Sequence, residues 1–165
     1  MPFTPYHFGP ASWIGLLFNR YLDFLTFLIA SVIIDIEPFL VIVFQLNYPL
    51  HGYLHTFLGA TFTAFLLAIL MNRLKPWLDN LMVIFHLKQP TNFSKIVIAS
   101  ICGCYSHILL DAPLYPDIHP FYPIKTNPIY SLVSSSTIYT FCAVSFLVGL
   151  ILLLIKIYAI KKENI

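Results

Sequence analysis

Two pairs of ionisable residues stand four positions apart inside apolar sequence. His51 and His55 form an H-x-x-x-H pair in the stretch HGYLHTFLGA, and His107 and Asp111 form an H-x-x-x-D pair in HILLD. Side chains four apart lie on the same face of a helix, so each pair can present two ligand groups together. Imidazole nitrogens combined with carboxylate oxygens suit zinc, manganese or iron. The spacing therefore predicts two helices that converge on a divalent metal.

The composition indicates which elements must position these residues. Of the 165 residues, 59% are hydrophobic and 10% are charged, and the mean hydropathy is +0.82. Soluble globular domains carry about 25% charged residues, so we expect a single integral membrane domain over 1–165. The net charge of +2 is too small for a nucleic-acid-binding surface. The three cysteines suit neither a disulfide framework nor a zinc motif.

The apolar segments predict an all-α, polytopic transmembrane helix bundle of about four or five membrane helices and one short interfacial helix. We expect a half-length element at 10–19, spans at 22–36, 53–72, 95–111 and 130–158, a segment at 39–50 too short to cross, and the interfacial helix at 76–88. Pro38 marks the expected break after the first full span. So short a bundle is also expected to bury more surface as a homo-oligomer.

Alternation of these spans sorts the charged residues by side. Eight basic residues fall on one face: Arg20, Arg73, Lys75, Lys88, Lys95, Lys156, Lys161 and Lys162. Only Lys125 falls on the other face, which predicts that the basic face and the C-terminus are cytoplasmic in a multi-pass cell-membrane protein. The extracytoplasmic face then collects histidines and carboxylates: His7, Asp35, Glu37, His51, His55, His107, Asp111, Asp117 and His119. Ionisable groups at the ends of spans favour a functional site.

The order of these motifs resembles a known family. It comprises an N-terminal histidine in TPYHFGP, the acidic pair in DIEP, the HGYLHT segment and the HILLD segment, from about residue 4 to residue 112. This order is similar to the membrane-bound metal-dependent hydrolases that are also described as LexA-binding and inner-membrane-associated. The chain departs from the family at Gly52 and Thr56, where members often have Arg and Ser. A weaker similarity in ligand order links the chain to zinc-dependent phospholipase C.

The resemblance implicates seven residues as the metal and catalytic set: His7, Asp35, Glu37, His51, His55, His107 and Asp111. One catalytic zinc typically has three protein ligands, so this set allows either one or two ions, with zinc expected and manganese or iron as alternatives. We expect Asp35 to ligate or bridge, Glu37 to act as general base or to orient a ligand histidine, and His7 to complete a second metal site.

The function that follows is hydrolysis of a lipid or amphipathic phosphoester by a metal-activated water. Two other functions stay open. One is a non-enzymatic membrane protein that handles protons or a metal ion in transport, which would need ionisable residues across the whole bilayer. The other is a structural protein with a stabilising metal, which would need a site closed by four protein ligands.

Two polar segments allow two interpretations each. The loop 113–128 contains five prolines and is either a rim over the site, with His119 and Lys125 facing an anionic headgroup, or a rigid connector. The hydroxyl residues of 131–140 favour either close helix packing or a polar substrate cavity.

Overall fold

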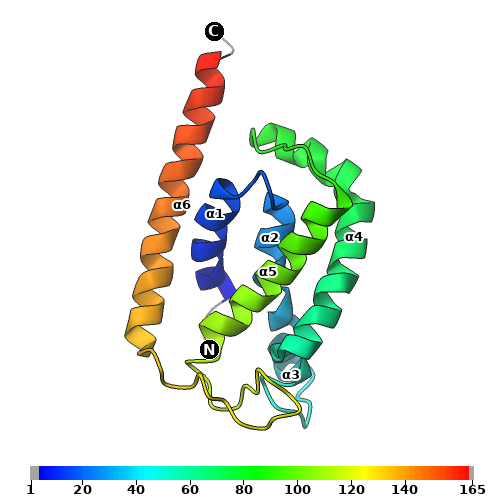
Figure 1. The fold of residues 1–165 in the computed structure, drawn as a ribbon, viewed down its shortest axis with the longest axis vertical. Helices are drawn as coiled ribbons and strands as arrows, with labels where there is room; N and C mark the ends of the chain where they lie inside the picture. Colours follow the sequence, from blue (N-terminus) through cyan, green and yellow to red (C-terminus); the bar gives the residue numbers. More distant parts are fainter. Residues whose placement is uncertain (1–3, 164–165) are drawn as a thin grey trace.

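The computed structural model describes residues 4–163, and within that range every regular element is helical. The elements in chain order are η1 (Thr4–His7), α1 (Phe8–Leu17), α2 (Phe24–Ala30), η2 (Ile33–Asp35), α3 (Ile36–Val43), η3 (Tyr53–His55), α4 (Phe57–Ile84), α5 (Phe93–Asp111) and α6 (Ser135–Glu163). Figure 1 shows them as a bundle with its long axis vertical. The all-α prediction is confirmed.

Four segments of the described chain are long and apolar enough to cross a membrane. They are Phe24–Val43, Phe57–Ile84, Phe93–Asp111 and Ser135–Ile160. Their surfaces carry many exposed large apolar side chains, which suits a lipid environment. The predicted membrane bundle is confirmed, and α1, with ten residues, is the predicted half-length element.

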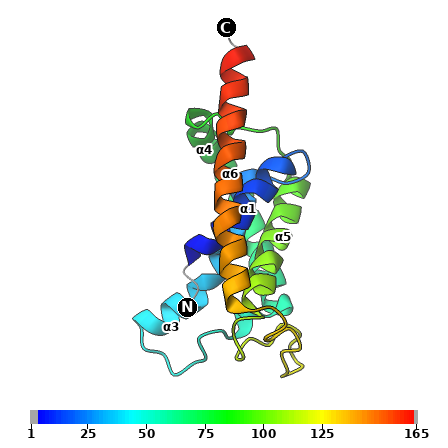
Figure 2. The same ribbon diagram turned by 90° about the vertical axis from the view of Figure 1, so that its left-hand side faces the viewer.

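Close contacts between small residues bring the helices together. A side chain at Gly103 of α5 would meet Ala30 of α2, and one at Gly9 of α1 would meet the backbone carbonyl of Cys142 in α6. Small residues of this kind let membrane helices approach closely. As a result α5 packs against α2 and α4, whereas α6 packs along α1 (Figure 2).

The break after α2 differs from the prediction at Pro38. The helix ends at Ala30, the chain passes through η2, and Pro38 lies in the first turn of α3, where a missing N–H costs no helical hydrogen bond. The chain leaves the helix at Ser31, whose carbonyl accepts a hydrogen bond from His107 Nδ1 at 2.8 Å. A tertiary contact, rather than the proline, coincides with the break.

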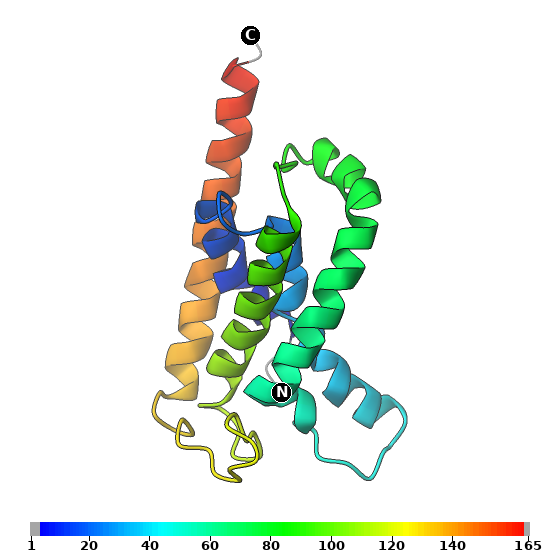
Figure 3. The same cartoon turned by 45° about the vertical axis from the view of Figure 1, so that its right-hand side comes forward.

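The separate interfacial helix predicted at 76–88 is wrong. Residues 57–84 form one helix with Pro76 inside it, and the helix turns over towards its C-terminal end (Figure 3). Proline usually kinks or breaks a helix. Here Lys75 bonds Asp23 of the α2 N-terminus (2.6 Å) and Asp79 one turn further on (3.1 Å), so ion pairs hold both sides of the proline.

Candidate metal site

Four ionisable side chains converge at the end of the bundle where α5 finishes. Asp35 comes from η2, His55 from η3, and His107 and Asp111 from the last two turns of α5. Each offers one ligand atom, and these atoms lie within 4.8 Å of one another. His55, His107 and Asp111 are buried, whereas 17% of the Asp35 side chain is exposed. Three separate elements therefore build one cluster, which we call the four-residue cluster.

The contacts inside the cluster are close but are not ordinary hydrogen bonds. His107 Nε2 lies 3.3 Å from Asp35 Oδ1 and 3.4 Å from Asp111 Oδ2, and His55 Nε2 lies 3.9 Å from Asp35 Oδ1. Both Nε2 atoms and both Asp111 oxygens are buried, and none makes a hydrogen bond within the described residues. Buried polar atoms are nearly always satisfied, so this arrangement fits ligand atoms that face a common cation.

The outer nitrogens of the two histidines are held by acceptors. His107 Nδ1 donates to the Ser31 carbonyl at 2.8 Å, and His55 Nδ1 donates to Glu37 Oε2 at 2.8 Å. A carbonyl can only accept, so Nδ1 of His107 carries a proton, and in the neutral ring Nε2 keeps the lone pair that a metal would need. Such outer contacts usually fix the orientation of metal-binding histidines.

The carboxylates around His55 also shape its protonation. Burial alone would lower the pKa of His55, but the contacts with Asp35 and Glu37 outweigh burial and the neighbouring His107, and its pKa is raised. The anionic surroundings thus favour positive charge at His55. A metal cation would supply that charge in place of a proton.

Glu37 holds the loop that carries His55. Its Oε2 accepts from the Gly52 N–H (2.9 Å), and its Oε1 accepts from the Leu54 N–H (3.0 Å) and lies 3.4 Å from the Tyr48 hydroxyl. With the His55 bond, four donors surround this one carboxylate. Of the two roles predicted for Glu37, the geometry favours orientation of His55 over general-base catalysis.

His51 and His55 do not share a helical face, so that part of the spacing argument is wrong. His55 belongs to η3, and α4 begins only at Phe57, with the Thr56 hydroxyl capping the Gly59 N–H at 2.9 Å. The two rings nevertheless lie 4.8 Å apart between centroids. The loop held by Glu37, rather than helical periodicity, brings them together.

His51 lies beside the four-residue cluster, and its metal ligation stays a prediction. Its Nδ1 bonds Asp117 Oδ2 at 3.0 Å, and its ring lies 4.3 Å from that of Tyr115. Burial and the nearby His55 lower the pKa of His51 more than Asp117 raises it. The imidazole is therefore neutral at neutral pH, with one nitrogen held by Asp117.

His7 lies against the cluster from the N-terminal side. Its Nε2 is 3.2 Å from Asp111 Oδ1, and its ring stacks on His107 at 4.1 Å between centroids. Both ring nitrogens are buried without a hydrogen bond in the described chain. The N-terminal segment folds over the same face as predicted, while the second metal site remains a prediction.

The two polar segments pack against different helices. In the loop 113–128, Pro120 is buried and its carbonyl accepts from the Phe57 N–H at 2.9 Å, so the loop packs on the start of α4. On α6, Ser136, Thr137 and Thr140 line a hollow of about 690 Å³ together with Trp13. None of the four-residue cluster lines this hollow.

Sequence patterns gave no signal for two groups that position the site. The Ser31 carbonyl is a backbone group, and Tyr48 reaches Glu37 from a loop without any motif. No sequence pattern indicates the ion pair of Lys75 with Asp23 either, because the two residues lie far apart in the chain.

Comparisons with protein-family models, with curated proteins and with solved structures found no match for this chain. The resemblance to membrane-bound metal-dependent hydrolases therefore rests on the motifs themselves, whose residues His7, Asp35, His55, His107 and Asp111 the fold gathers at one end of the bundle.

Proposed function

We propose that this membrane protein is a metal-dependent hydrolase whose divalent cation is held by the four-residue cluster. The observation that carries the proposal is the convergence of Asp35, His55, His107 and Asp111, whose ligand atoms lie within 4.8 Å of one another. Among the residues that the structure describes, Nε2 of His55, Nε2 of His107 and the two Asp111 oxygens have no hydrogen-bond partner.

The donor set fits a divalent cation. Two imidazole nitrogens and two carboxylate oxygens are ligands that zinc, manganese and iron accept. A buried carboxylate such as Asp111 is costly without a compensating positive charge. Two carboxylates supply two negative charges, which a divalent cation balances.

The chemistry supplied by the cation is water activation, because a bound divalent ion lowers the pKa of water from 15.7 to about 7. The chain itself supplies orientation. Ser31 and Glu37 fix the two histidine rings. Asp35, as the partly exposed member of the cluster, lies where water and substrate can approach.

A lipid or amphipathic phosphoester is the substrate class that suits this location. The cluster lies at the end of apolar helices long enough to span a membrane, and the ends of such helices are where phospholipid headgroups meet the hydrocarbon core. The motif resemblance to metal-dependent hydrolases and the weaker similarity to zinc-dependent phospholipase C support the same class.

A structural metal is the second candidate function. Four protein ligands would close a tetrahedral zinc site, and closed sites are typical of structural zinc. The burial of three of the four residues favours this alternative. A five- or six-coordinate ion would instead leave room for water.

Metal analysis tests the proposal directly. Elemental mass spectrometry of the detergent-purified protein should find about one zinc, manganese or iron ion per chain, and Asp35→Ala and His107→Ala should each lose it. His86→Asn is the matched control, because His86 is exposed and outside the cluster.

Hydrolysis of short-chain phospholipids then separates the two candidates. Turnover that depends on the loaded metal and disappears in His107→Ala supports the hydrolase. Stoichiometric metal without turnover of any phosphoester would favour the structural role, and a wild-type protein that stays metal-free after loading would overturn both.

A further inference from the structure

A pocket of about 330 Å³ opens beside the metal site, between the loop that carries His51 and the loop that carries Asp117. Its walls include three tyrosines, Tyr48, Tyr53 and Tyr122. The rings of Tyr53 and Tyr122 meet edge to face at 5.7 Å between centroids. A volume of this size suits a small ligand group.

The charge of the pocket is unbalanced. Asp117 lines it with 42% of its side chain exposed, together with His119 and with His51, whose Nδ1 bonds Asp117 at 3.0 Å, and no lysine or arginine lines it within residues 4–163. Aromatic rings attract organic cations through their negative faces, and an adjacent carboxylate adds to that attraction. Tyrosine walls with one acid therefore fit an ammonium group better than an anion.

The wall of the pocket is held in place before any ligand binds. The Tyr48 hydroxyl accepts from the Tyr53 N–H at 2.9 Å and lies 3.4 Å from Glu37. A side chain at Gly52 would clash with the Tyr48 ring, so glycine allows the ring to pack there. Such preorganisation lowers the entropic cost of binding.

The pocket shares residues with the surroundings of the metal site. His51 lines the pocket and its ring contacts that of His55. Thr56, the residue after His55, also lines it. A group bound in the pocket would therefore lie next to His51 and close to the loop that carries His55, and both histidines are candidate metal ligands.

We infer that this pocket binds an organic ammonium group, either the headgroup of a zwitterionic phospholipid or a free ammonium compound. As a statement about ligand binding, the inference is independent of catalysis. As a statement about the substrate, it rests on the proposed hydrolase function and narrows the phosphoester to one with a cationic headgroup.

Titration calorimetry on the detergent-purified full chain, stripped of metal with a chelator, tests the inference. Choline should bind, and its neutral isostere 3,3-dimethylbutanol should bind at least about tenfold more weakly, because it has the same shape without the charge. Dihexanoylphosphocholine separates the sources: tighter binding than choline indicates a lipid headgroup, and equal binding indicates a free ammonium compound.

Two variants of the wall should weaken choline binding by about threefold or more. Tyr53→Leu removes an aromatic face, and Asp117→Asn removes the charge while keeping a polar partner for His51. Tyr130→Leu is the matched control, because Tyr130 is an exposed tyrosine of the same loop region that does not line the pocket.

The inference is overturned if choline does not bind, if the isostere binds equally well, if inorganic phosphate binds in place of choline, or if both wall variants bind like the control. Metal content of the same preparation, measured before stripping and again after reloading with zinc, keeps the two proposals apart. Protein that holds metal but not choline refutes the pocket alone, and protein that holds choline but takes up no metal refutes the hydrolase alone.

Discussion

Glu37 is the residue on which most of the site's local geometry depends. Its two oxygens contact His55 Nδ1, two backbone N–H groups and the Tyr48 hydroxyl. The acceptor on Nδ1 directs the opposite Nε2 of His55 towards Asp35. The metal affinity should therefore depend on a residue that does not bind the metal.

Glu37→Gln should weaken metal binding by about 10- to 100-fold, the usual loss when such an outer partner is removed. The glutamine amide keeps the size of the side chain, but it lacks the charge and one acceptor. Competition with a chromophoric chelator measures the affinity. Asp79→Asn, at the opposite end of the bundle, should leave it unchanged, and an unaltered affinity in Glu37→Gln would show that His55 needs no such support.

The residues of the site were predictable to different degrees. His107 and Asp111 lie on one helix, so their spacing of four residues was enough to predict that the two side chains lie together. The fold brings both into the cluster. Asp35 and His55 come from short 3-10 turns, which have no sequence period to read. The closeness of His51 and His55 depends on hydrogen bonds to Glu37 from a distant segment, and no local pattern encodes such a contact.

At the scale of the elements, one buried ion pair ties α2 to α4. Asp23 caps α2 through the Thr26 N–H (3.0 Å) and bonds Lys75 of α4 at 2.6 Å. Burial raises the pKa of Asp23, but the bonds from Lys75 and Thr26 outweigh it and lower the pKa below its ordinary 3.8. The ionised form of Asp23 is therefore part of the folded state.

Asp23→Asn should reduce the free energy of unfolding by about 3 kcal/mol at neutral pH. This value is at the low end of the loss expected when one partner of a buried ion pair is removed, because Asp79 still contacts Lys75. Thermal unfolding in detergent measures the loss. Asp79→Asn, whose side chain is partly exposed, should cost less than about 1 kcal/mol. Equal losses in the two variants would contradict the cap-and-pair role of Asp23.

The lowered pKa of Asp23 predicts that the free energy of unfolding depends on pH. A carboxylate whose pKa is lowered on folding stabilises the protein above its unfolded pKa, and this contribution is lost as the pH falls through the folded value. The stability difference between wild type and Asp23→Asn should thus be constant well above the ordinary pKa of 3.8 and shrink as the pH falls below it. A difference that does not shrink at all as the pH falls below 3.8 would count against this assignment.

The contact of α1 with α6 depends on glycine. A Cβ at Gly9 would clash with the Cys142 carbonyl, which is backbone and cannot rotate away. Gly9→Ala should therefore destabilise the protein by about 1–3 kcal/mol through overpacking. Ala143→Val adds volume at an exposed position of α6 and should change stability by less than about 0.5 kcal/mol. Thermal unfolding that shows no difference between these variants would contradict the close packing.

Element types were easier to predict than element ends. Long apolar runs identified the four spans because helices that cross lipid must satisfy their own backbone groups. The ends of the helices depend on tertiary contacts. The helix α2 ends just before Ser31, whose carbonyl accepts a hydrogen bond from His107. The helix α4 continues through Pro76, where Lys75 forms ion pairs with Asp23 and Asp79. The break predicted at Pro38 and the separate helix predicted from residue 76 therefore both differ from the fold.

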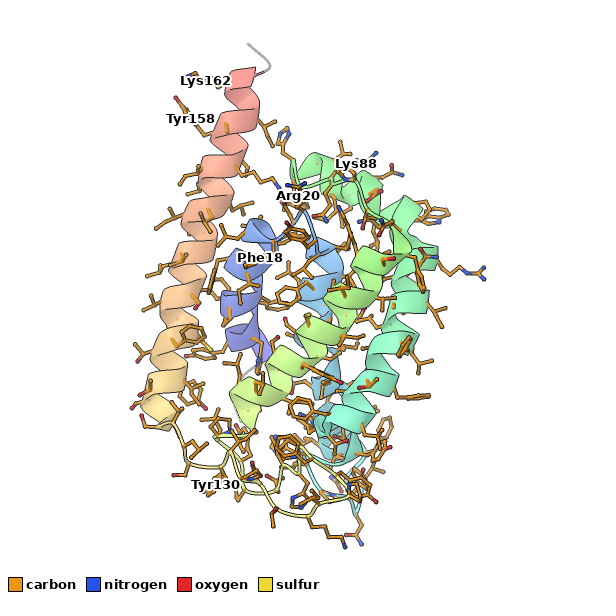
Figure 4. The ribbon with its side chains drawn as sticks, in the orientation of Figure 1. Phe18, Arg20, Lys88, Tyr130, Tyr158 and Lys162 are labelled. Carbon is orange, nitrogen blue, oxygen red and sulfur yellow. The ribbon has the colours of Figure 1, made fainter. Side chains whose placement is uncertain are left out.

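At the scale of the whole molecule, the two ends of the bundle differ in charge. Arg20, Lys88 and Lys162 lie at one end, and Tyr130 lies at the other, with the loop that follows α5 (Figure 4). The four-residue cluster belongs to the Tyr130 end, because Asp111 closes α5 there. Basic residues favour the cytoplasmic side of a membrane, which predicts that the cluster faces outward. The homo-oligomer expected from the sequence stays a prediction.

Cysteine labelling in intact cells measures that orientation. Tyr130→Cys should react with a membrane-impermeant maleimide added outside, whereas Lys88→Cys should react only after the membrane is permeabilised. The native cysteines give a low background, because Cys104 and Cys142 are buried and Cys102 lies within a membrane-spanning helix. The wild-type chain, labelled in parallel, measures that background. Reversed labelling would place the cluster in the cytoplasm, and the phosphoester would then have to come from the inner leaflet or from a cytoplasmic amphipath.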